Sequence, residues 1–247
     1  MEKRKTKLKT TSKQIPPKVS VVLSVYNGEQ FLNEAVRSIL GQTFKDFEFI
    51  IIDDGSTDAS KKIIETLIDS RIHLIFRKNK GLTPSLNEGL KLSTGEFIAR
   101  MDADDIAEPK RIEKQVAFLE RHPDVYLCGT WAKIIDEKGE KKGDFITPIE
   151  SSQVKKMMFW HNPFIHPSVM FRRKIVDTIG YYSEKIKYAQ DYEYWSRIIK
   201  NFPGSNIPEF LMQYRISKRS MTRKSNIAMR WEGIKIRAKY LLESPLK

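Results

Sequence analysis

Three carboxylates, Asp102, Asp104 and Asp105, lie within four residues, directly after the apolar segment 96–99. Carboxylates this close repel one another and are costly to desolvate unless a cation lies between them. A hard divalent ion that bridges the protein to a phosphate group is the expected ligand. The alternative is a solvated acidic turn that caps the next helix, because aspartate is a common capping residue.

Two other polar groups also follow apolar segments. Ser24, Tyr26 and Asn27 lie at the end of the run 18–25, and an aspartate pair that includes Asp54 follows the run 47–52. These nearly continuous β-branched runs are typical of strands buried on both faces of a parallel sheet.

The intervening segments have the apolar spacing of helices. Helices are expected at about 31–40, 60–68 and 83–92, and they alternate with the strands 18–25, 47–52, 72–76 and 96–99. This alternation predicts a parallel α/β sheet with right-handed crossovers, in which ligands bind at the carboxyl ends of the strands. The three polar groups are therefore expected on one rim.

The chain lacks both GxGxxG and GxxxxGK[ST], so a phosphate group must be held in another way. Asp104 is expected to bind Mg²⁺ or Mn²⁺, which would hold the phosphate. A carboxylate at Asp54 suits hydrogen bonds from a uracil-like base or a ribose hydroxyl. Lys80 and Arg100 flank the predicted site loops, where their charge would offset that of a diphosphate.

Length and composition predict a globular protein with a sizeable core. The chain has 247 residues, 40% of them hydrophobic, which suits one large domain or a domain with a small appendage. Neither an apolar run of bilayer length nor a signal peptide is apparent, so we expect a cytoplasmic protein. Cys128, the single cysteine, lies in an apolar run and is expected in the core.

The net charge of +13 is concentrated at the two ends. Residues 1–18 carry +6 and residues 215–247 carry +8, whereas the remainder carries −1. Residues 1–17 are expected to be a disordered basic tail. Residues 215–247 have the apolar spacing of a basic amphipathic helix, with an apolar stripe at Ile227, Trp231, Ile234, Ala238 and Leu241 or Leu242. This helix either packs on its own domain or lies on an anionic membrane at the inner face of the cell. No nucleic-acid partner is expected.

The ordered motifs of this chain resemble family 2 glycosyltransferases with the GT-A fold. Residues 18–120 carry the dense part of the resemblance, through VSVVLSVYN (19–27), SILGQTF (38–44), IIDDGSTD (51–58), NKGL (79–82), LNEGL (86–90) and TGEFIARMDADD (94–105). HPSVMFR (166–172) and AQDYEYWSR (189–197) are similar to acceptor-side segments of bacterial members that build surface polysaccharides.

The resemblance implies a mainly parallel GT-A sheet flanked by helices, with a helical C-terminal extension. Residues 18–120 would bind the nucleotide sugar and residues 121–214 the acceptor. The implied reaction is metal-dependent transfer from a nucleoside-diphosphate sugar, with a UDP-sugar favoured. The acceptor would be a hydroxyl of a saccharide or lipid-linked saccharide, in polysaccharide or glycolipid synthesis, and the anomeric configuration would invert.

The resemblance also implies individual roles. Ser24 and Asp54 would contact the nucleotide base, Asp102 the sugar side of the donor, and Asp104 the Mn²⁺ or Mg²⁺ ion. Asp105 would keep the helix-capping role. Asp191 matches the family's catalytic base. Tyr26, Asn27 and Lys80 complete the expected nucleotide-sugar site.

The sequence leaves several alternatives open. Gln190 stands where the family usually has glutamate, so Asp191 lacks a like charge that would raise its pKa. Either Asp191 is then a somewhat weaker base, or its partner role lies with Glu193. Asp191 would otherwise be a helix-terminal aspartate, and His166 either a metal or diphosphate ligand or a hydrogen-bonded loop residue. A nucleotidyltransferase, a metal-dependent phosphohydrolase and a non-catalytic membrane- or RNA-binding module are the competing functions.

Overall fold

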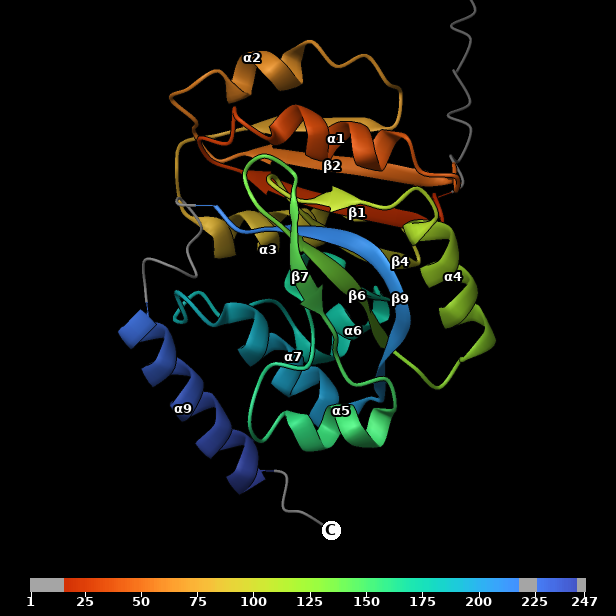
Figure 1. Cartoon of the computed structure of the whole chain (residues 1–247), viewed down its shortest axis with the longest axis vertical. Helices are drawn as coiled ribbons and strands as arrows, with labels where there is room; N and C mark the ends of the chain where they lie inside the picture. Colours follow the sequence, from red (N-terminus) through yellow and green to blue (C-terminus); the bar gives the residue numbers. More distant parts are fainter. Residues whose placement is uncertain (1–15, 218–225, 244–247) are drawn as a thin grey trace, which may run out of the picture.

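The computed structural model of the chain describes residues 16–217 and 226–243 (Figure 1). Nearly all of the predicted basic tail, 1–17, lies outside these residues. Within the described ranges, no helix is both long and apolar enough to cross a bilayer.

The first half of the fold alternates strands and helices as the sequence predicts. The observed elements are β1 (Val19–Val25), α1 (Leu32–Leu40), β2 (Phe47–Asp53), α2 (Ser60–Glu65), β3 (Ile72–Phe76), α3 (Leu82–Leu92) and β4 (Phe97–Asp102). The four strands run parallel in the order β3-β2-β1-β4. Ser24 pairs with Asp102 and Val25 with Asp53, so the polar segments that follow the strands share one edge of the sheet.

The second half extends the same sheet with mixed strand directions. Its elements are β5 (Ile106–Ala107), α4 (Arg111–Arg121), β6 (Leu127–Ile135), β7 (Lys141–Phe145), α5 (Ser151–Met157), the 3₁₀ turn η1 (His166–Ser168), β8 (Met170–Arg172), α6 (Lys174–Ile179), α7 (Gln190–Asn201), β9 (Gly204–Arg215) and α9 (Asn226–Glu243). The order continues from β4 through β8, β6 and β9 to β5, with β7 paired to β6. Strand β8 is antiparallel to β4 and β6, whereas β6 and β9 are parallel.

Two apolar clusters lie on opposite faces of the sheet. Successive side chains of a strand point to opposite faces, and in β1 Val21 and Leu23 belong to one cluster whereas Val22 belongs to the other. Helices α1, α2 and α4 contribute to the first cluster, and α3, α5, α6, α7 and α9 contribute to the second. The expected core position of Cys128 is confirmed, because the residue is fully buried and its pKa is raised to about 12 by burial.

The proposed capping role of Asp105 is wrong. The residue precedes the short strand β5, and α4 begins only at Arg111. One carboxylate oxygen of Asp105 instead accepts the backbone N–H of Arg215 on β9 at 2.7 Å. A partner 110 positions away in the chain leaves no local signal in the sequence.

The predicted C-terminal helix is present as α9, but its apolar spacing does not mark its packing face. Ile236 and Tyr240 are buried against the second cluster. Ile227, Trp231 and Leu242, which belong to the predicted apolar stripe, are 74%, 61% and 85% exposed. The helix therefore packs on its own domain and still presents apolar side chains on its outer surface.

Candidate active site

A cavity of about 780 Å³ opens at the carboxyl edge of the parallel strands. Its volume lies within the range of small-ligand sites. Segments from both halves of the chain and from α9 line it, and they bring together seven of the predicted site residues: Ser24, Tyr26, Asn27, Asp102, Asp104, His166 and Asp191.

Asp54 and Lys80 are not among the described residues that line this cavity. Asp54 is buried, and its carboxylate accepts hydrogen bonds from Arg77 Nε at 2.8 Å and from the backbone N–H groups of Lys80 at 3.0 Å and Gly81 at 2.7 Å. These contacts fix the loop that leads into α3. The expected contact of Asp54 with the nucleotide base stays a prediction.

Asn27 joins two of the strand ends. Its φ of 53° lies in the left-handed region, which asparagine tolerates better than most residues. The side-chain Oδ1 accepts the backbone N–H of Thr57 at 2.8 Å, and the Asn27 N–H donates to Ser56 Oγ at 3.0 Å. Because the Ser56 N–H in turn donates to Asp53 at 2.9 Å, the loops after β1 and β2 form one unit.

The acidic cluster has the donor atoms of a divalent cation site. One oxygen from each of Asp102, Asp104 and Asp105 lies within 4.8 Å of the others. Burial, and then the charge of Asp102, raises the pKa of Asp104 to about 6, and burial raises the pKa of Asp105 well above its usual value. The second oxygen of Asp105 is buried without a hydrogen-bond partner in the described part of the chain. A cation would offset this repulsion, so the residues fit a hard divalent ion.

Two arginines border the acidic cluster. Arg100 is 3% exposed, lines the cavity and pairs with the Asp102 carboxylate. Arg215 donates from Nε to the Asp104 carbonyl at 2.8 Å and pairs with Glu34. The sequence singled out Arg100 by its place after a strand, whereas Arg215 gave no signal because all these partners are distant in the chain.

Asp191 enters the cavity from the first turn of α7. Its Oδ2 accepts a hydrogen bond from Asn162 Nδ2 at 2.7 Å, and burial raises its pKa to about 6. The neighbouring Gln190 is 4% exposed and also lines the cavity. The Gln190 amide does not titrate, and the other carboxylate of this turn, Glu193, pairs with Arg197. Neither group therefore competes with Asp191 for a proton.

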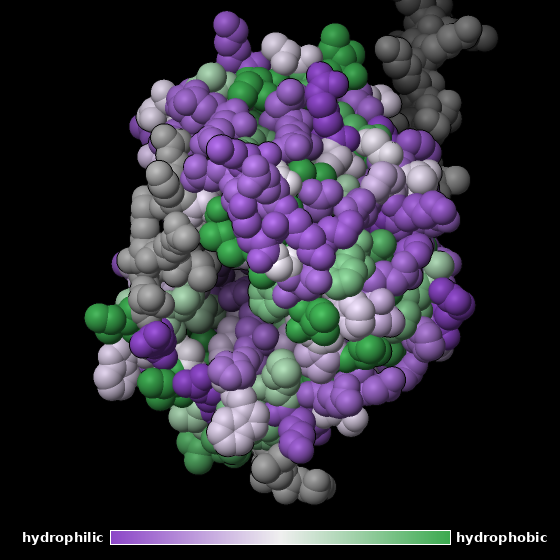
Figure 2. Space-filling view, in the orientation of Figure 1, coloured by the Kyte–Doolittle hydropathy of each residue, from purple (hydrophilic) through white to green (hydrophobic). Residues whose placement is uncertain are grey.

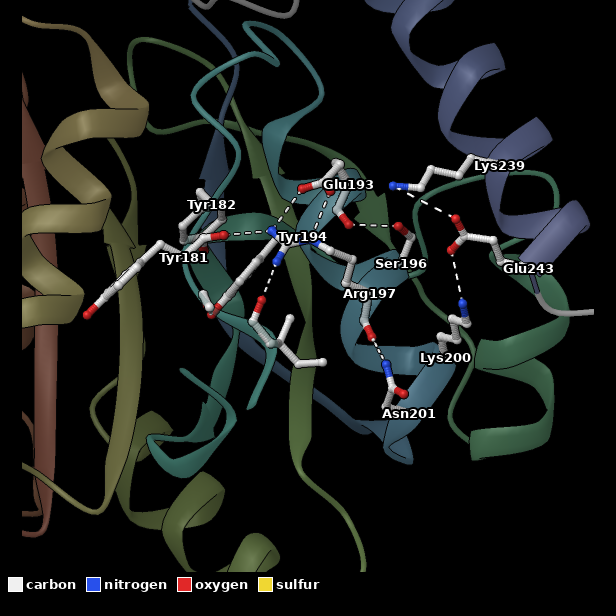
Figure 3. Close-up of polar contacts among 12 residues, drawn as sticks. Tyr181, Tyr182, Glu193, Tyr194, Ser196, Arg197, Lys200, Asn201, Lys239 and Glu243 are labelled. Atoms are coloured by element: carbon white, nitrogen blue, oxygen red, sulfur yellow. Dashed lines mark hydrogen bonds and ion pairs between the residues drawn. The ribbon is translucent and has the colours of Figure 1, made fainter. Parts of the chain in front are cut away.

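Glu193 belongs to the network that fixes α7 (Figure 3). Its carboxylate accepts a hydrogen bond from Arg197 Nε at 2.8 Å, and Arg197 also donates to the carbonyls of Ile179 at 2.6 Å and Tyr181 at 2.7 Å. These contacts tie α7 to the segment after α6. Glu193 is therefore paired with Arg197, and it is not one of the described residues that line the cavity.

His166 lies beside the cavity with a polar partner. Its Nε2 lies 3.2 Å from the Tyr182 hydroxyl, and burial followed by the charge of Arg100 lowers its pKa well below the usual value. The imidazole is therefore neutral at physiological pH. A neutral ring can accept a hydrogen bond or ligate a metal through its unprotonated nitrogen.

Residues 20–180 match the family model of glycosyl transferase family 2. The chain belongs to this family. Two relatives of this glycosyltransferase extend the match beyond residue 180. An uncharacterized glycosyltransferase of Methanocaldococcus jannaschii is 39% identical over 210 residues, which cover 82% of this chain and 72% of the relative. The amylovoran biosynthesis glycosyltransferase AmsE of Erwinia amylovora is 33% identical over 235 residues, or 92% of this chain and 86% of AmsE.

Solved structures confirm the GT-A fold expected for the family. The chain superposes on S. aureus TarS in complex with UDP-GlcNAc with a TM-score of 0.75 and 21% identity, over 93% of this chain and 68% of TarS. The mannosyltransferase PcManGT of Pyrobaculum calidifontis, in complex with GDP-Man and Mn²⁺, gives a TM-score of 0.68 and 19% identity, over 92% and 65% of the two chains.

Proposed function

We propose that this family 2 glycosyltransferase moves a sugar from a nucleoside-diphosphate sugar to an acceptor hydroxyl with inversion of the anomeric configuration. A UDP-sugar is the favoured donor, and a saccharide or lipid-linked saccharide of polysaccharide or glycolipid synthesis is the acceptor. Residues 18–120 form the donor half and residues 121–214 the acceptor half of one domain.

One observation carries this proposal. Asp191 and two members of the acidic cluster, Asp102 and Asp104, line the same cavity, although they come from opposite halves of the chain. An inverting displacement needs a base on the acceptor side and positive charge at the leaving diphosphate. Asp191 supplies the base, and Arg100 lines the same cavity with an Nε that has no hydrogen-bond partner in the described ranges.

In the proposed reaction, Asp191 takes the proton of the acceptor hydroxyl as its oxygen attacks the anomeric carbon. The bond from that carbon to the diphosphate oxygen breaks, and the nucleoside diphosphate leaves with the bonding electrons. A base whose pKa is about 6 is mostly ionised at neutral pH, which suits this task. Asn162 orients the carboxylate through its hydrogen bond to Oδ2.

The donor contacts follow from the same cavity. Ser24, Tyr26 and Asn27 are proposed to contact the nucleotide, together with Asp54 and Lys80. Asp102 is proposed to contact the sugar side. Asp104, with His166 as a further ligand, would hold Mn²⁺ or Mg²⁺, which would offset charge on the diphosphate. The Mn²⁺ complex of PcManGT supports a divalent ion.

Product analysis tests this proposal against its alternatives. The purified chain with Mn²⁺ and UDP-GlcNAc, UDP-glucose, UDP-galactose or GDP-mannose should release a nucleoside diphosphate from at least one donor. Given a nucleoside triphosphate and a sugar 1-phosphate instead, a nucleotidyltransferase would form pyrophosphate, and a phosphohydrolase acting on the diphosphate of the donor would form a nucleoside monophosphate. Release of either product in place of a nucleoside diphosphate would overturn the proposal.

We also propose that the protein lies at the inner face of the cell membrane through α9. Trp231 on this helix and Trp160 beside it are 61% and 66% exposed, and Lys235 and Lys239 are also exposed. Figure 2 shows hydrophobic and hydrophilic residues mixed over this part of the surface, at the lower left. Exposed tryptophan beside cations suits the interface of an anionic bilayer.

A further inference from the structure

Helix α9 holds the segment that leads directly into α7. The Glu232 carboxylate accepts three backbone N–H groups: those of Lys187 at 3.1 Å, Tyr188 at 2.9 Å and Ala189 at 3.0 Å. Lys187 donates to Oε1, and the other two donate to Oε2. The next residues are Gln190, where α7 begins, and Asp191.

A second contact from the same helix holds the loop that carries the hydrogen-bond partner of Asp191. Arg237 donates from its guanidinium to the Trp160 carbonyl at 2.8 Å. Trp160 lies two residues before Asn162, whose side chain donates to Asp191 at 2.7 Å. Helix α9 therefore contacts both the backbone that leads to Asp191 and the loop that carries Asn162, the hydrogen-bond donor to Asp191.

These contacts have the strength needed to set a side-chain position. Hydrogen bonds to an ionised acceptor are shorter and about twice as strong as those between neutral groups. The carbonyl of Ala189 also accepts the N–H of Glu193 at 3.0 Å, so a fixed Ala189 fixes the first turn of α7. Glu232 is not one of the described cavity-lining residues, so any influence it has on the reaction must pass through this backbone.

We propose that Glu232 is a positioning residue for Asp191, with Arg237 in support. This inference rests on the proposed role of Asp191 as the base. It makes α9 a part of the acceptor side of the site, so that displacement of this helix reduces the rate of sugar transfer without altering donor binding.

Glu232→Gln tests the inference, because the glutamine side chain keeps the size of glutamate but replaces one acceptor oxygen with an NH₂ donor. Glu243→Gln is the matched control. Glu243 lies on the same helix and accepts a hydrogen bond from Lys200 at 3.0 Å (Figure 3). Lys200 lies near the end of α7, whereas Asp191 lies in its first turn. Both variants lose one carboxylate that joins α9 to neighbouring elements.

The first measurement is hydrogen–deuterium exchange of peptides that span residues 187–189, which needs no substrate. In Glu232→Gln these amides should exchange about tenfold faster than in the wild type, because charge-assisted hydrogen bonds are lost. In Glu243→Gln their exchange should not change. Unchanged exchange in Glu232→Gln would overturn the inference.

The second measurement is steady-state turnover with whichever of the four donors named above the wild type uses. Glu232→Gln should lower kcat roughly ten- to hundredfold, as expected for a misplaced reacting group, with an unchanged donor KM. Arg237→Met should change kcat in the same direction. An unchanged kcat in Glu232→Gln, or an equal loss in Glu243→Gln, would overturn the inference.

Asp191→Asn, measured in parallel, separates the two proposals. If Asp191→Asn loses turnover while Glu232→Gln keeps it, the base assignment stands and the positioning role is wrong. If Asp191→Asn keeps turnover, the base assignment is wrong, and the positioning role proposed for Glu232 is overturned with it.

Discussion

A base must be ionised to accept a proton, and for Asp191 burial opposes ionisation. The raised pKa of about 6 means that the active form predominates only above that pH. The rate of transfer should therefore rise with pH through about 6 and level off above it. Gln190, directly before this base, is uncharged at every pH. It therefore does not change the pKa of Asp191, which is raised by burial.

Gln190→Glu tests how a neighbouring charge affects the pKa of Asp191. A second carboxylate beside Asp191 should raise the pKa of the base, because two neighbouring negative charges disfavour each other. The acid limb of the kcat–pH profile should move to higher pH by about one pH unit, and turnover at pH 6 should fall. Gln190→Met, which adds no charge, is the control. A midpoint that stays in place or moves to lower pH would contradict the assignment of this limb to Asp191.

Single residues differ in how far the sequence could place them. The acidic cluster was predictable because its members are adjacent in the chain and follow a buried strand. Arg215 and Asn162 were not predictable as site residues, since their partners Asp105 and Asp191 are distant in sequence. Asp105 was misassigned for the same reason, because local spacing alone favoured a helix cap.

Among the elements, the strands β1, β2 and β3 were predicted to within one residue at each end, whereas the strand expected at 96–99 runs from Phe97 to Asp102 as β4. The β-branched runs of β1 and β2 are buried on both faces and leave little choice of structure, whereas β3 at the sheet edge is only partly buried. The mixed strands β5 to β9 pair over long distances and carry weaker patterns. For α9 the helical period was correct, but its packing face was not predictable. Ile236 and Tyr240 are buried because of contacts with the second cluster, which the local sequence does not contain.

The outer surface of α9 predicts binding to anionic vesicles. The full chain should co-sediment with phosphatidylglycerol vesicles and not with phosphatidylcholine vesicles. Lys235→Gln combined with Lys239→Gln should weaken binding roughly 30-fold, since each cation near an anionic surface contributes about 1 kcal/mol. Trp231→Ser should also weaken it through loss of an exposed apolar side chain.

The same pair of substitutions on another element is the control for this test. Lys61→Gln with Lys62→Gln removes two cations from α2, and should leave vesicle binding nearly unchanged. Equal loss in both double variants would indicate attraction to the overall charge of the chain rather than docking through α9. Equal binding to both kinds of vesicle would contradict an electrostatic contact.

For the whole molecule, the cavity is the product of the fold rather than of any one motif. The parallel half supplies Asp102 and Asp104, the second half supplies Asp191, and α9 closes one side. The sequence located the charge at the two termini and the chemistry between them. It could not show that the C-terminal helix lines the cavity, because the helical period gives the spacing of residues within the helix and not the position of the helix relative to the site.

Divalent ions and nucleotide should stabilise the folded chain in a pH-dependent way. Ligand at 100 times its Kd adds about 2.7 kcal/mol, which should raise Tm by at least about 5 °C. Mn²⁺ with UDP should raise Tm more at pH 7.5 than at pH 5, because Asp104, with a pKa of about 6, must lose its proton to bind a cation. Asp104→Asn should remove most of the Mn²⁺-dependent shift. A shift that is larger at pH 5 would contradict the metal assignment.

The most direct test of the account is the turnover of Asp191→Asn with its donor affinity measured in the same preparation. Loss of the general base should lower kcat roughly 100- to 10,000-fold. The Kd for the donor with Mn²⁺ should remain close to that of the wild type, since Asp191 is assigned to the acceptor side. Turnover near the wild-type rate, with donor binding intact, would contradict the claim that Asp191 is the base for sugar transfer.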